Sequence, residues 1–267
     1  MRRRSSRIRA LLWASLFAFS PTVPGCEGEQ ATAGTGAGEI AVAVRQYPHD
    51  AGAYTQGLLF RDGDLYESTG QLGRSSVRRV NLQTGEVQAR TDLPGDRFGE
   101  GLALIGDRLI QLSWTSGVGY IYDRATLALQ DSFTYTGQGW GLTYDGESLI
   151  LSDGTSRIRF LDPLTFAVRR TLDVQDGGAP LMEINELEWV DGQILANVYR
   201  TDYIVRIDPA TGNVLSWIDL GDVYPSSQRP GSADVLNGIA WDEAGRRLFV
   251  TGKLWPVLFE VEIRPTS

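Results

Sequence analysis

The sequence predicts an all-β protein made of repeated units, and three observations support this fold class. Glycine is abundant, at 31 of 267 residues, whereas methionine occurs only 2 times. That composition is more typical of short strands joined by tight turns than of packed helices. Short apolar segments such as Leu65-Tyr66 and Leu109-Ile110 follow turns rich in glycine and acidic residues, as expected of strands. The third observation is a motif that recurs at residues 56, 100, 140, 185 and 237, in steps of 44, 40, 45 and 52 residues.

The N-terminal residues have the three-part layout of an export signal. Residues 1–9 contain five arginines and no acidic residue, residues 10–19 are apolar, and a stretch containing proline and glycine follows. The apolar run is too short to be a permanent transmembrane helix. We therefore predict a signal peptide over residues 1–25, a flexible tether rich in Gly, Ala, Thr and Glu over residues 26–38, and one folded domain over residues 39–267.

The single cysteine predicts a membrane anchor. Cys26 follows Val23, Pro24 and Gly25, a pattern that resembles a bacterial lipobox, in which the cysteine is acylated and becomes the new N-terminus. The sequence thus predicts an exported protein, periplasmic or tethered to the membrane as a lipoprotein through a lipid at Cys26 only. Because Pro24 is unusual in a lipobox, ordinary signal cleavage and secretion are the alternative.

Charge and residue counts exclude several classes of function. The net charge is -8, and removal of residues 1–25 would make it -13, from 20 basic and 33 acidic residues. This argues against a basic face that binds nucleic acid. With 1 Cys and 1 His in the chain, a thiolate or imidazole zinc site is improbable, and no disulfide supports the fold.

The internal repeat predicts five copies of one unit. A Gln-Gly-Leu-like motif marks each copy, and its copies are Tyr-Thr-Gln-Gly-Leu (54–58), Phe-Gly-Glu-Gly-Leu (98–102), Gln-Gly-Trp-Gly-Leu (138–142), Glu-Ile-Asn-Glu-Leu (183–187) and Val-Leu-Asn-Gly-Ile (235–239). A second hairpin in each of the first four units has an Asn- or Asp-initiated turn, at residues 81–85, 123–126, 162–165 and 208–212. In such turns the side chain at the first position accepts bonds from backbone N–H groups.

Four short strands in a unit of 40–45 residues are typical of a blade of a β-propeller. We predict one five-bladed propeller, with a β-sandwich of accidental repetition as the alternative. The fifth unit ends early, near residues 259–263, so its missing outer strand is assigned to residues 40–44. This N-terminal strand would complete the last blade and close the ring without leaving open sheet edges.

Equivalent positions of the blades form rings around a central channel. The first ring is Gln56, Glu100, Trp140, Asn185 and Asn237, and the second, at the ends of the second strands, is Gly70, Trp114, Gly154, Tyr199 and Lys253. A ring with a purely structural role would be expected to repeat one residue type. These equivalent positions instead carry different residue types, as a binding or catalytic site at the channel mouth requires. The alternative is that these groups only satisfy one another's hydrogen bonds along the axis.

Glu100 is the candidate proton-transfer group because it is the carboxylate of the first ring. Aromatic residues expected nearby would desolvate it, raise its pKa and suit it to acid–base work near neutral pH. Lys253 is expected to contribute a cation, although a solvated lysine at a strand end is the alternative. The carboxamides of Gln56, Asn185 and Asn237 can donate to an oxyanion and accept from an ammonium.

The sequence assigns no chemical role to four other acidic or basic residues. His49 lies in a turn before the first unit and is predicted to be structural. Glu67 falls on the predicted second strand of its unit, whereas Glu186 lies within the repeat motif of its unit and Glu188 follows that motif; each side chain faces either the channel or the other side of its strand. The Pro/Ser/Gly-rich stretch 222–234 is either a rim of the pocket or a surface for a partner.

The repeats carry motifs that resemble the plant-type and bacterial glutaminyl cyclases. Besides the first three repeat motifs, the matching segments are Tyr-Glu-Ser-Thr-Gly (66–70), Ser-Asp-Gly-Thr (152–155), Asn-Glu-Leu-Glu (185–188), Leu-Asn-Gly-Ile-Ala (236–240) and Thr-Gly-Lys-x-Trp-Pro (251–256). The resemblance covers residues 40–263 and implies a five-bladed propeller enzyme that needs no metal or other cofactor. It leaves room for structural calcium in the channel without indicating it, and we expect a monomer.

The resemblance also implies residue roles. The family's catalytic acid falls on Glu100, and its pocket residues fall on Gln56, Phe98, Trp114, Trp140, Asn185 and Lys253. Tyr199 departs from the family's usual tryptophan, which puts the pocket's shape and substrate preference in question. We take Glu100, Lys253, Asn185 and Gln56 as catalytic candidates, and Phe98, Trp114, Trp140, Tyr199 and Asn237 as substrate-binding candidates.

The reaction that this resemblance implies is the conversion of an N-terminal Gln of a peptide or protein to pyroglutamate, with release of ammonia. Glu100 would act as general acid and base, and Lys253 with Asn185 or Gln56 would stabilise the oxyanion. Two alternatives remain. One is a calcium-dependent propeller lactonase or esterase, with Glu100, Asn185 and Asn237 as metal ligands. The other is a non-enzymatic propeller scaffold that binds a partner through its outer loops.

Overall fold

The computed structural model describes residues 37–266, and these form an all-β fold. Three antiparallel four-stranded sheets follow one another along the chain, each with its strands in sequence order. They consist of β2 (Thr55–Arg61), β3 (Asp64–Thr69), β4 (Ser76–Asn81) and β5 (Val87–Asp92); β6 (Gly99–Ile105), β7 (Arg108–Ser113), β8 (Val118–Asp123) and β9 (Leu129–Thr134); and β10 (Leu142–Tyr144), β11 (Leu149–Leu151), β12 (Arg157–Leu161) and β13 (Val168–Asp173).

The remaining long strands form one eight-stranded sheet in the order β16-β17-β18-β19-β1-β22-β21-β20. These are β1 (Ala37–Pro48), β16 (Ile184–Val190), β17 (Gln193–Val198), β18 (Tyr203–Ile207), β19 (Val214–Asp219), β20 (Leu236–Asp242), β21 (Arg247–Gly252) and β22 (Val257–Pro265). A small ladder of β14 (Gln175–Asp176) and β15 (Ala179–Pro180), and the 3-10 turn η1 (Ser226–Gln228), lie in the connections. Within residues 37–266 no helix is long and apolar enough to span a membrane.

The N-terminal strand pairs with the C-terminal strand, as the sequence predicts. β1 runs antiparallel to β22 from Glu39 opposite Pro265 to Pro48 opposite Val257. A second pairing was not predicted: the first residues of β1 run parallel to β19, with Gly38 opposite Trp217. This contact fuses two four-stranded groups into one sheet. β1 begins at Ala37, two residues inside the predicted tether, and the predicted signal peptide and Cys26 lie outside the described residues.

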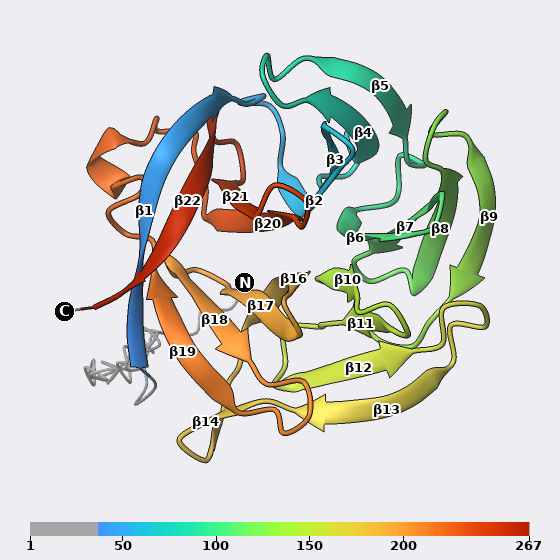
Figure 1. Ribbon diagram of the computed structural model, residues 1–267. Helices are drawn as coiled ribbons and strands as arrows, with labels where there is room; N and C mark the ends of the chain where they lie inside the picture. Colours follow the sequence, from blue (N-terminus) through green and yellow to red (C-terminus); the bar gives the residue numbers. More distant parts are fainter. Residues whose placement is uncertain (1–36, 267) are drawn as a thin grey trace, which may run out of the picture. The chain divides into compact units, whose positions relative to one another are not determined.

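The first strand of each group lies at the centre of the described part. β2, β6, β10, β16 and β20 contact one another in a closed cycle, and the outer strands β5, β9, β13 and β19 lie at the periphery (Figure 1). The apolar core lies between neighbouring sheets. One cluster, for example, joins Leu59 and Val77 of the first sheet to Leu109 and Tyr122 of the second. Side-chain burial between adjacent sheets therefore holds the inner strands at fixed positions.

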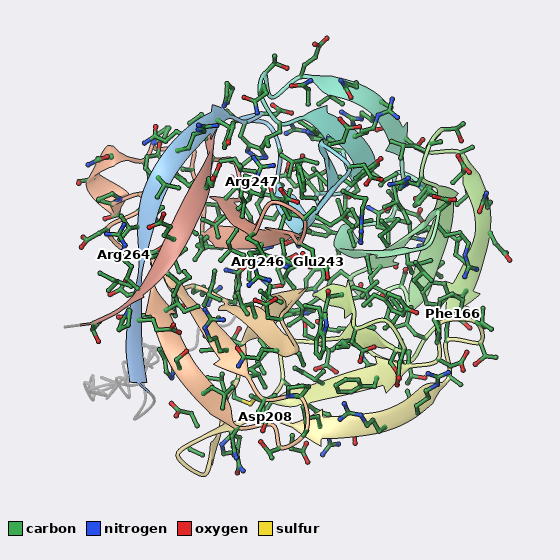
Figure 2. The ribbon with its side chains drawn as sticks, in the orientation of Figure 1. Phe166, Asp208, Glu243, Arg246, Arg247 and Arg264 are labelled. Atoms are coloured by element: carbon green, nitrogen blue, oxygen red, sulfur yellow. The ribbon has the colours of Figure 1, made fainter. Side chains whose placement is uncertain are left out.

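The predicted hairpin turns between the outer strands have the expected mechanism. In all four, Oδ1 of the first residue accepts a backbone N–H two or three residues further on. The bond from Thr165 N to Asp162 is 2.7 Å long, and that from Ala210 N to Asp208 is 2.9 Å long. Asp208 lies at the periphery of the fold (Figure 2). These local bonds fix the hairpins and leave the inner strand ends free to carry the site.

The inner strands approach one another so closely that most of them need glycine at one shared position. A Cβ atom on Gly101 would collide with the backbone of residues 140–142, and one on Gly141 would collide with the Asn185 carbonyl. The fourth group has Glu186 at this position, and its carboxylate is fully buried. Oε1 accepts the Leu58 N–H at 3.3 Å and Oε2 the Ile239 N–H at 2.9 Å. Glu186 therefore ties β16 to β2 and β20 across the centre.

Candidate active site

The structure gathers the first-ring residues at the N-terminal ends of the inner strands. Gln56, Glu100, Asn185 and Asn237 are the first or second residues of β2, β6, β16 and β20, and Trp140 precedes β10 by two residues. All four polar members of this ring are buried. Lys253 follows directly after β21 and is also buried. These residues therefore share one end of the inner strands, which contact one another in a cycle.

Glu100 is a buried carboxyl group with few partners. Burial raises its pKa well above the usual value, and the charge of Lys253 and a hydrogen bond with the Gln56 side chain oppose this shift only in part. A carboxyl group with a raised pKa can both accept and release a proton near neutral pH. Glu100 thus has the electrostatics that proton transfer requires.

Lys253 is the only lysine of the chain, and aromatic rings enclose its ammonium. Its Nζ lies 4.9 Å from the ring centre of Tyr54 and 5.1 Å from that of Tyr199. Burial lowers the pKa of Lys253, whereas the charges of Glu100 and Asp234 raise it. A partly desolvated ammonium beside Glu100 is well placed to bind a developing negative charge.

Aromatic side chains form the walls around these charges. Trp140 packs edge-on against Tyr199, with ring centres 5.6 Å apart, and Phe98 packs against Trp114 at 5.8 Å. Two glycines of the second ring make room for these walls. A Cβ atom on Gly154 would lie 2.7 Å from the Trp140 ring, and one on Gly70 would collide with Phe98. The alternation of glycine and aromatic residues in the second ring therefore has a steric cause.

The carboxamide side chains of the site have some, but not all, of their hydrogen-bond partners within the protein. Asn237 Nδ2 donates to the Thr55 carbonyl at 3.0 Å and lies 3.4 Å from Gln56 Oε1. The Oδ1 atoms of Asn185 and Asn237 are buried and have no hydrogen-bond partner. Buried acceptors without a partner are costly in a folded protein, and at a candidate site they mark positions where a bound donor would be stabilised.

Sequence reasoning missed three residues that the structure adds to the site. Tyr54 donates its hydroxyl to Asp234 Oδ2 at 3.1 Å, and burial together with the Asp234 charge raises the pKa of this tyrosine. Gln138 Oε1 accepts the indole N–H of Trp114 at 2.7 Å and that of Trp140 at 2.9 Å. Tyr54 and Gln138 each lie two positions before a first-ring residue. Both residues precede β2 and β10 rather than lying on these strands, so their shared offset from the first-ring position is the signal in the sequence, whereas Asp234 lies in a loop and carries no such signal.

The structure settles the positions of the residues left open by the sequence. His49 is buried and bonded to the Trp255 carbonyl through Nδ1 at 2.7 Å and to Glu67 Oε1 through Nε2 at 3.1 Å. Burial alone would lower the pKa of His49, but the adjacent Glu67 carboxylate raises it. Glu67 also accepts the Thr55 hydroxyl at 2.7 Å and lies 3.6 Å from Arg78. These contacts make His49 and Glu67 part of a structural cluster behind β2.

The stretch 222–234 contacts the site through its last residue, Asp234. The Asp234 side chain accepts the Tyr54 hydroxyl, and the Asp234 backbone N–H donates to the Lys253 carbonyl at 2.9 Å. Arg229 stacks over the Trp255 ring at 4.7 Å and binds Asp202 at 2.8 Å. These contacts hold the stretch against the fold and place Asp234 beside Lys253.

A separate cavity of about 560 Å³ lies at the C-terminal ends of the inner strands. Glu188, Arg61 and Thr143 line it, together with Glu243 of the β20–β21 turn and Arg247, the first residue of β21; Figure 2 labels both of the latter residues. Burial raises the pKa of Glu188 to about 8. Glu188 accepts the Trp241 N–H at 2.8 Å and the Thr143 hydroxyl at 3.3 Å, so this acid joins neighbouring strands, as Glu186 does.

Within the described part of the chain, no three His, Cys, Asp or Glu side chains converge as metal ligands. The oxygen-rich set of Glu100, Asn185 and Asn237 has Lys253 beside its only carboxylate. An ammonium at this position would repel a divalent cation bound to Glu100. The oxygen set therefore fits an N–H group of a substrate better than it fits calcium.

Comparisons with known proteins agree with this geometry. The profile of the glutamine cyclotransferase family matches residues 20–263. A curated glutaminyl-peptide cyclotransferase from Arabidopsis thaliana is 43% identical over 228 residues, which cover 84% of this chain and 71% of that protein. The crystal structure of the Myxococcus xanthus glutaminyl cyclase superposes with a TM-score of 0.81 and 38% sequence identity, covering 87% of this chain and 100% of that one.

Proposed function

The chain belongs to the glutamine cyclotransferase family, and we propose that it is a glutaminyl-peptide cyclotransferase, which converts the N-terminal Gln of peptides and proteins to pyroglutamate and releases ammonia. One observation carries this proposal most directly. Glu100, a buried carboxyl group with a raised pKa, lies beside the chain's only lysine in a mouth walled by aromatic rings. Proton transfer and charge stabilisation are what this cyclisation needs.

Glu100 moves the protons of the reaction. The α-amine nitrogen of the substrate attacks the side-chain amide carbon, a C–N bond forms, and the bond to the amide nitrogen breaks. Glu100 takes a proton from the attacking nitrogen and donates it to the leaving nitrogen, which departs as NH₃. Its raised pKa matches both halves of this transfer. Because both reacting groups belong to one residue, binding the folded-over Gln supplies the proximity.

The negative charge on the amide oxygen is stabilised by Lys253 with Gln56 or Asn185. The Lys253 ammonium lies over the rings of Tyr54 and Tyr199, which do not neutralise its charge, so it is available to the substrate. One such donor is worth about 3–4 kcal/mol in comparable oxyanion sites. Asn237 holds the Gln56 side chain and the Thr55 backbone in place, and its free Oδ1 is an acceptor for the substrate amine.

The aromatic walls bind the aliphatic part of the Gln side chain. Trp114 and Trp140 share the Gln138 acceptor, while Phe98 and Tyr199 pack against them. Excluding water from this space favours cyclisation over hydrolysis. Tyr199 also faces Lys253, so in this chain the position carries an additional contact to the ammonium.

The proposal includes the finer architecture and the cellular location. We take the fold as a five-bladed propeller in which the eight-stranded sheet counts as two blades joined through β1 and β19, supported by the closed cycle of inner strands. The enzyme needs no cofactor and acts as a monomer. It is exported, as a lipoprotein anchored at Cys26 in the periplasm or, alternatively, as a secreted protein. Mass spectrometry of the mature N-terminus tests this: an unmodified terminus without Cys26 excludes the lipoprotein.

An ammonia-release assay on Gln-initiated peptides, run with and without a chelator, tests the activity. The expected products are free ammonia and a peptide lighter by one ammonia, formed equally in both conditions. The same preparation is offered a panel of lactones and esters. Turnover of lactones that depends on calcium, with none of Gln peptides, would establish the metal-dependent alternative, and no turnover of either class would favour the binding scaffold.

A further inference from the structure

A small groove lies directly outside the candidate active site, between the loops that follow β3, β5 and β7. It has a volume of about 210 Å³, and its lining residues are Leu72, Asp96, Phe98, Trp114, Thr115 and Ser116. Pockets for drug-sized ligands measure roughly 300–1,000 Å³, so this groove accommodates about one side chain. It shares Phe98 and Trp114 with the walls of the active site.

Two apolar side chains of the groove are exposed. Leu72 is 64% exposed and Trp114 is 42% exposed, and both sit at the edge of the pocket. Exposed apolar groups that adjoin a binding site commonly mark its continuation. The one carboxylate of the groove, Asp96, is paired with Arg97 at 3.0 Å, so the groove offers no unpaired charge to a ligand.

Hydrogen bonds fix both sides of the groove in place. On one side, Ser75 Oγ donates to the Gln71 carbonyl at 2.8 Å and accepts the Gly99 N–H at 3.0 Å, which ties the Leu72 loop to β6. On the other side, Trp114 N donates to the Phe98 carbonyl at 2.9 Å, and Gln138 holds the indole. The groove is therefore formed before a ligand binds, which lowers the entropic cost of binding.

We propose that this groove binds the side chain of the second residue of the peptide substrate and favours apolar side chains such as Leu or Phe. This inference rests on the proposed function. The peptide bond of a bound N-terminal Gln must leave the active site past its aromatic walls. Since Phe98 and Trp114 belong to both spaces, the next side chain reaches the groove without crossing solvent.

The test compares kcat/KM for three amidated tripeptides, Gln-Leu-Gly, Gln-Gly-Gly and Gln-Glu-Gly. The wild-type enzyme is expected to favour the leucine peptide over the glycine peptide about tenfold, because a single methylene in an apolar pocket is already worth about tenfold. Leu72→Ser should reduce this ratio to about threefold or less. Leu129→Ser, at a leucine that is 56% exposed on β9, is the matched control and should keep the wild-type ratio.

A charge substitution gives a second, independent readout. Leu72→Lys should raise kcat/KM for the glutamate peptide relative to the leucine peptide, because it places a cation in the groove. The groove assignment would be overturned if kcat/KM were equal for all three peptides and if neither Leu72→Ser nor Leu72→Lys changed these values. The cyclase activity itself would then still stand. Failure of the wild-type enzyme to release ammonia from any of the peptides would overturn the proposed function and this inference together.

Discussion

Glu100 on β6 and Glu186 on β16 both lie on inner strands, yet their partners differ completely. Both are buried, and burial raises the pKa of both. The two carboxylate oxygens of Glu186 accept backbone N–H groups of two other strands. Glu100 instead lies beside Lys253 and Gln56 in the candidate active site. A raised pKa in a central position therefore does not identify a catalytic acid. The carboxylate whose oxygens are not committed to backbone donors is the one available to a substrate.

The largest expected effect is on Glu100. Glu100→Gln keeps the size of the side chain but removes its ability to accept a proton, so kcat should fall by about 10²–10⁴-fold. Stability should stay the same or rise, because a buried carboxylate with few donors is unfavourable. Ammonia release and urea unfolding on one preparation measure both. Near-normal turnover of this variant would remove Glu100 from the mechanism.

Removal of the Lys253 ammonium tests the other half of the same pair. Lys253→Met should lower kcat by about 10²–10³-fold, as for loss of one oxyanion donor. It should also move the acidic limb of the pH–rate profile to higher pH. The charge of Lys253 lowers the pKa of Glu100, so without it Glu100 stays protonated, and inactive as a base, to a higher pH.

The wild-type pH profile of kcat/KM provides the reference for that comparison. Activity should fall on the acidic side as Glu100 becomes protonated and on the basic side as Lys253, whose pKa is lowered by burial, loses its proton. A variant whose acidic limb coincides with that of the wild type would show that Lys253 does not act on Glu100. Lys253→Arg retains the charge and should restore the acidic limb even if its rate remains low.

Glu186 should show the reverse pattern, with lower stability and intact chemistry. In Glu186→Gln one backbone N–H faces an amide donor instead of an acceptor, which costs about 1–3 kcal/mol of unfolding free energy. The folded-state pKa of Glu186 is raised above its unfolded value near 4.5, so the folded state binds the extra proton. Stability therefore declines as the pH rises through and above 4.5, and the variant should lose part of this slope.

Denaturant unfolding at several pH values, paired with kcat of the folded fraction, checks this prediction. In the variant, part of the decline of unfolding free energy with pH should remain. We expect it to come from Glu100 and Glu188, whose pKa values are also raised. A large loss of kcat at unchanged stability would assign Glu186 to the catalytic machinery. The distinction between a structural Glu186 and a catalytic Glu100 would then be wrong.

Sequence reasoning could place Glu100 and Lys253 because their positions follow from the repeat spacing. The same spacing aligns Glu186 with the glycines at 101 and 141 and shows that it is exceptional. It cannot show which donors its oxygens meet, because these belong to strands more than 50 residues away. The parallel pairing of β1 with β19 could not be predicted from the sequence either, because it depends on where the N-terminal strand lies relative to the edge of another sheet. Local patterns are readable from sequence, whereas long-range partners require the fold.

The smallest expected effect concerns Gln138, which supports the walls of the site rather than its charges. Gln138→Leu removes the acceptor shared by the Trp114 and Trp140 indoles, and one such hydrogen bond contributes about 1 kcal/mol. Because the loss is in wall orientation, KM for Gln peptides should rise several-fold, while kcat and the pH profile stay close to those of the wild type. Gln138→Glu keeps an acceptor for both indoles and should restore most of the lost affinity. If Gln138→Leu instead lowers kcat as much as Lys253→Met does, the walls contribute to the chemistry itself, and the site cannot be divided into charges that react and rings that only bind.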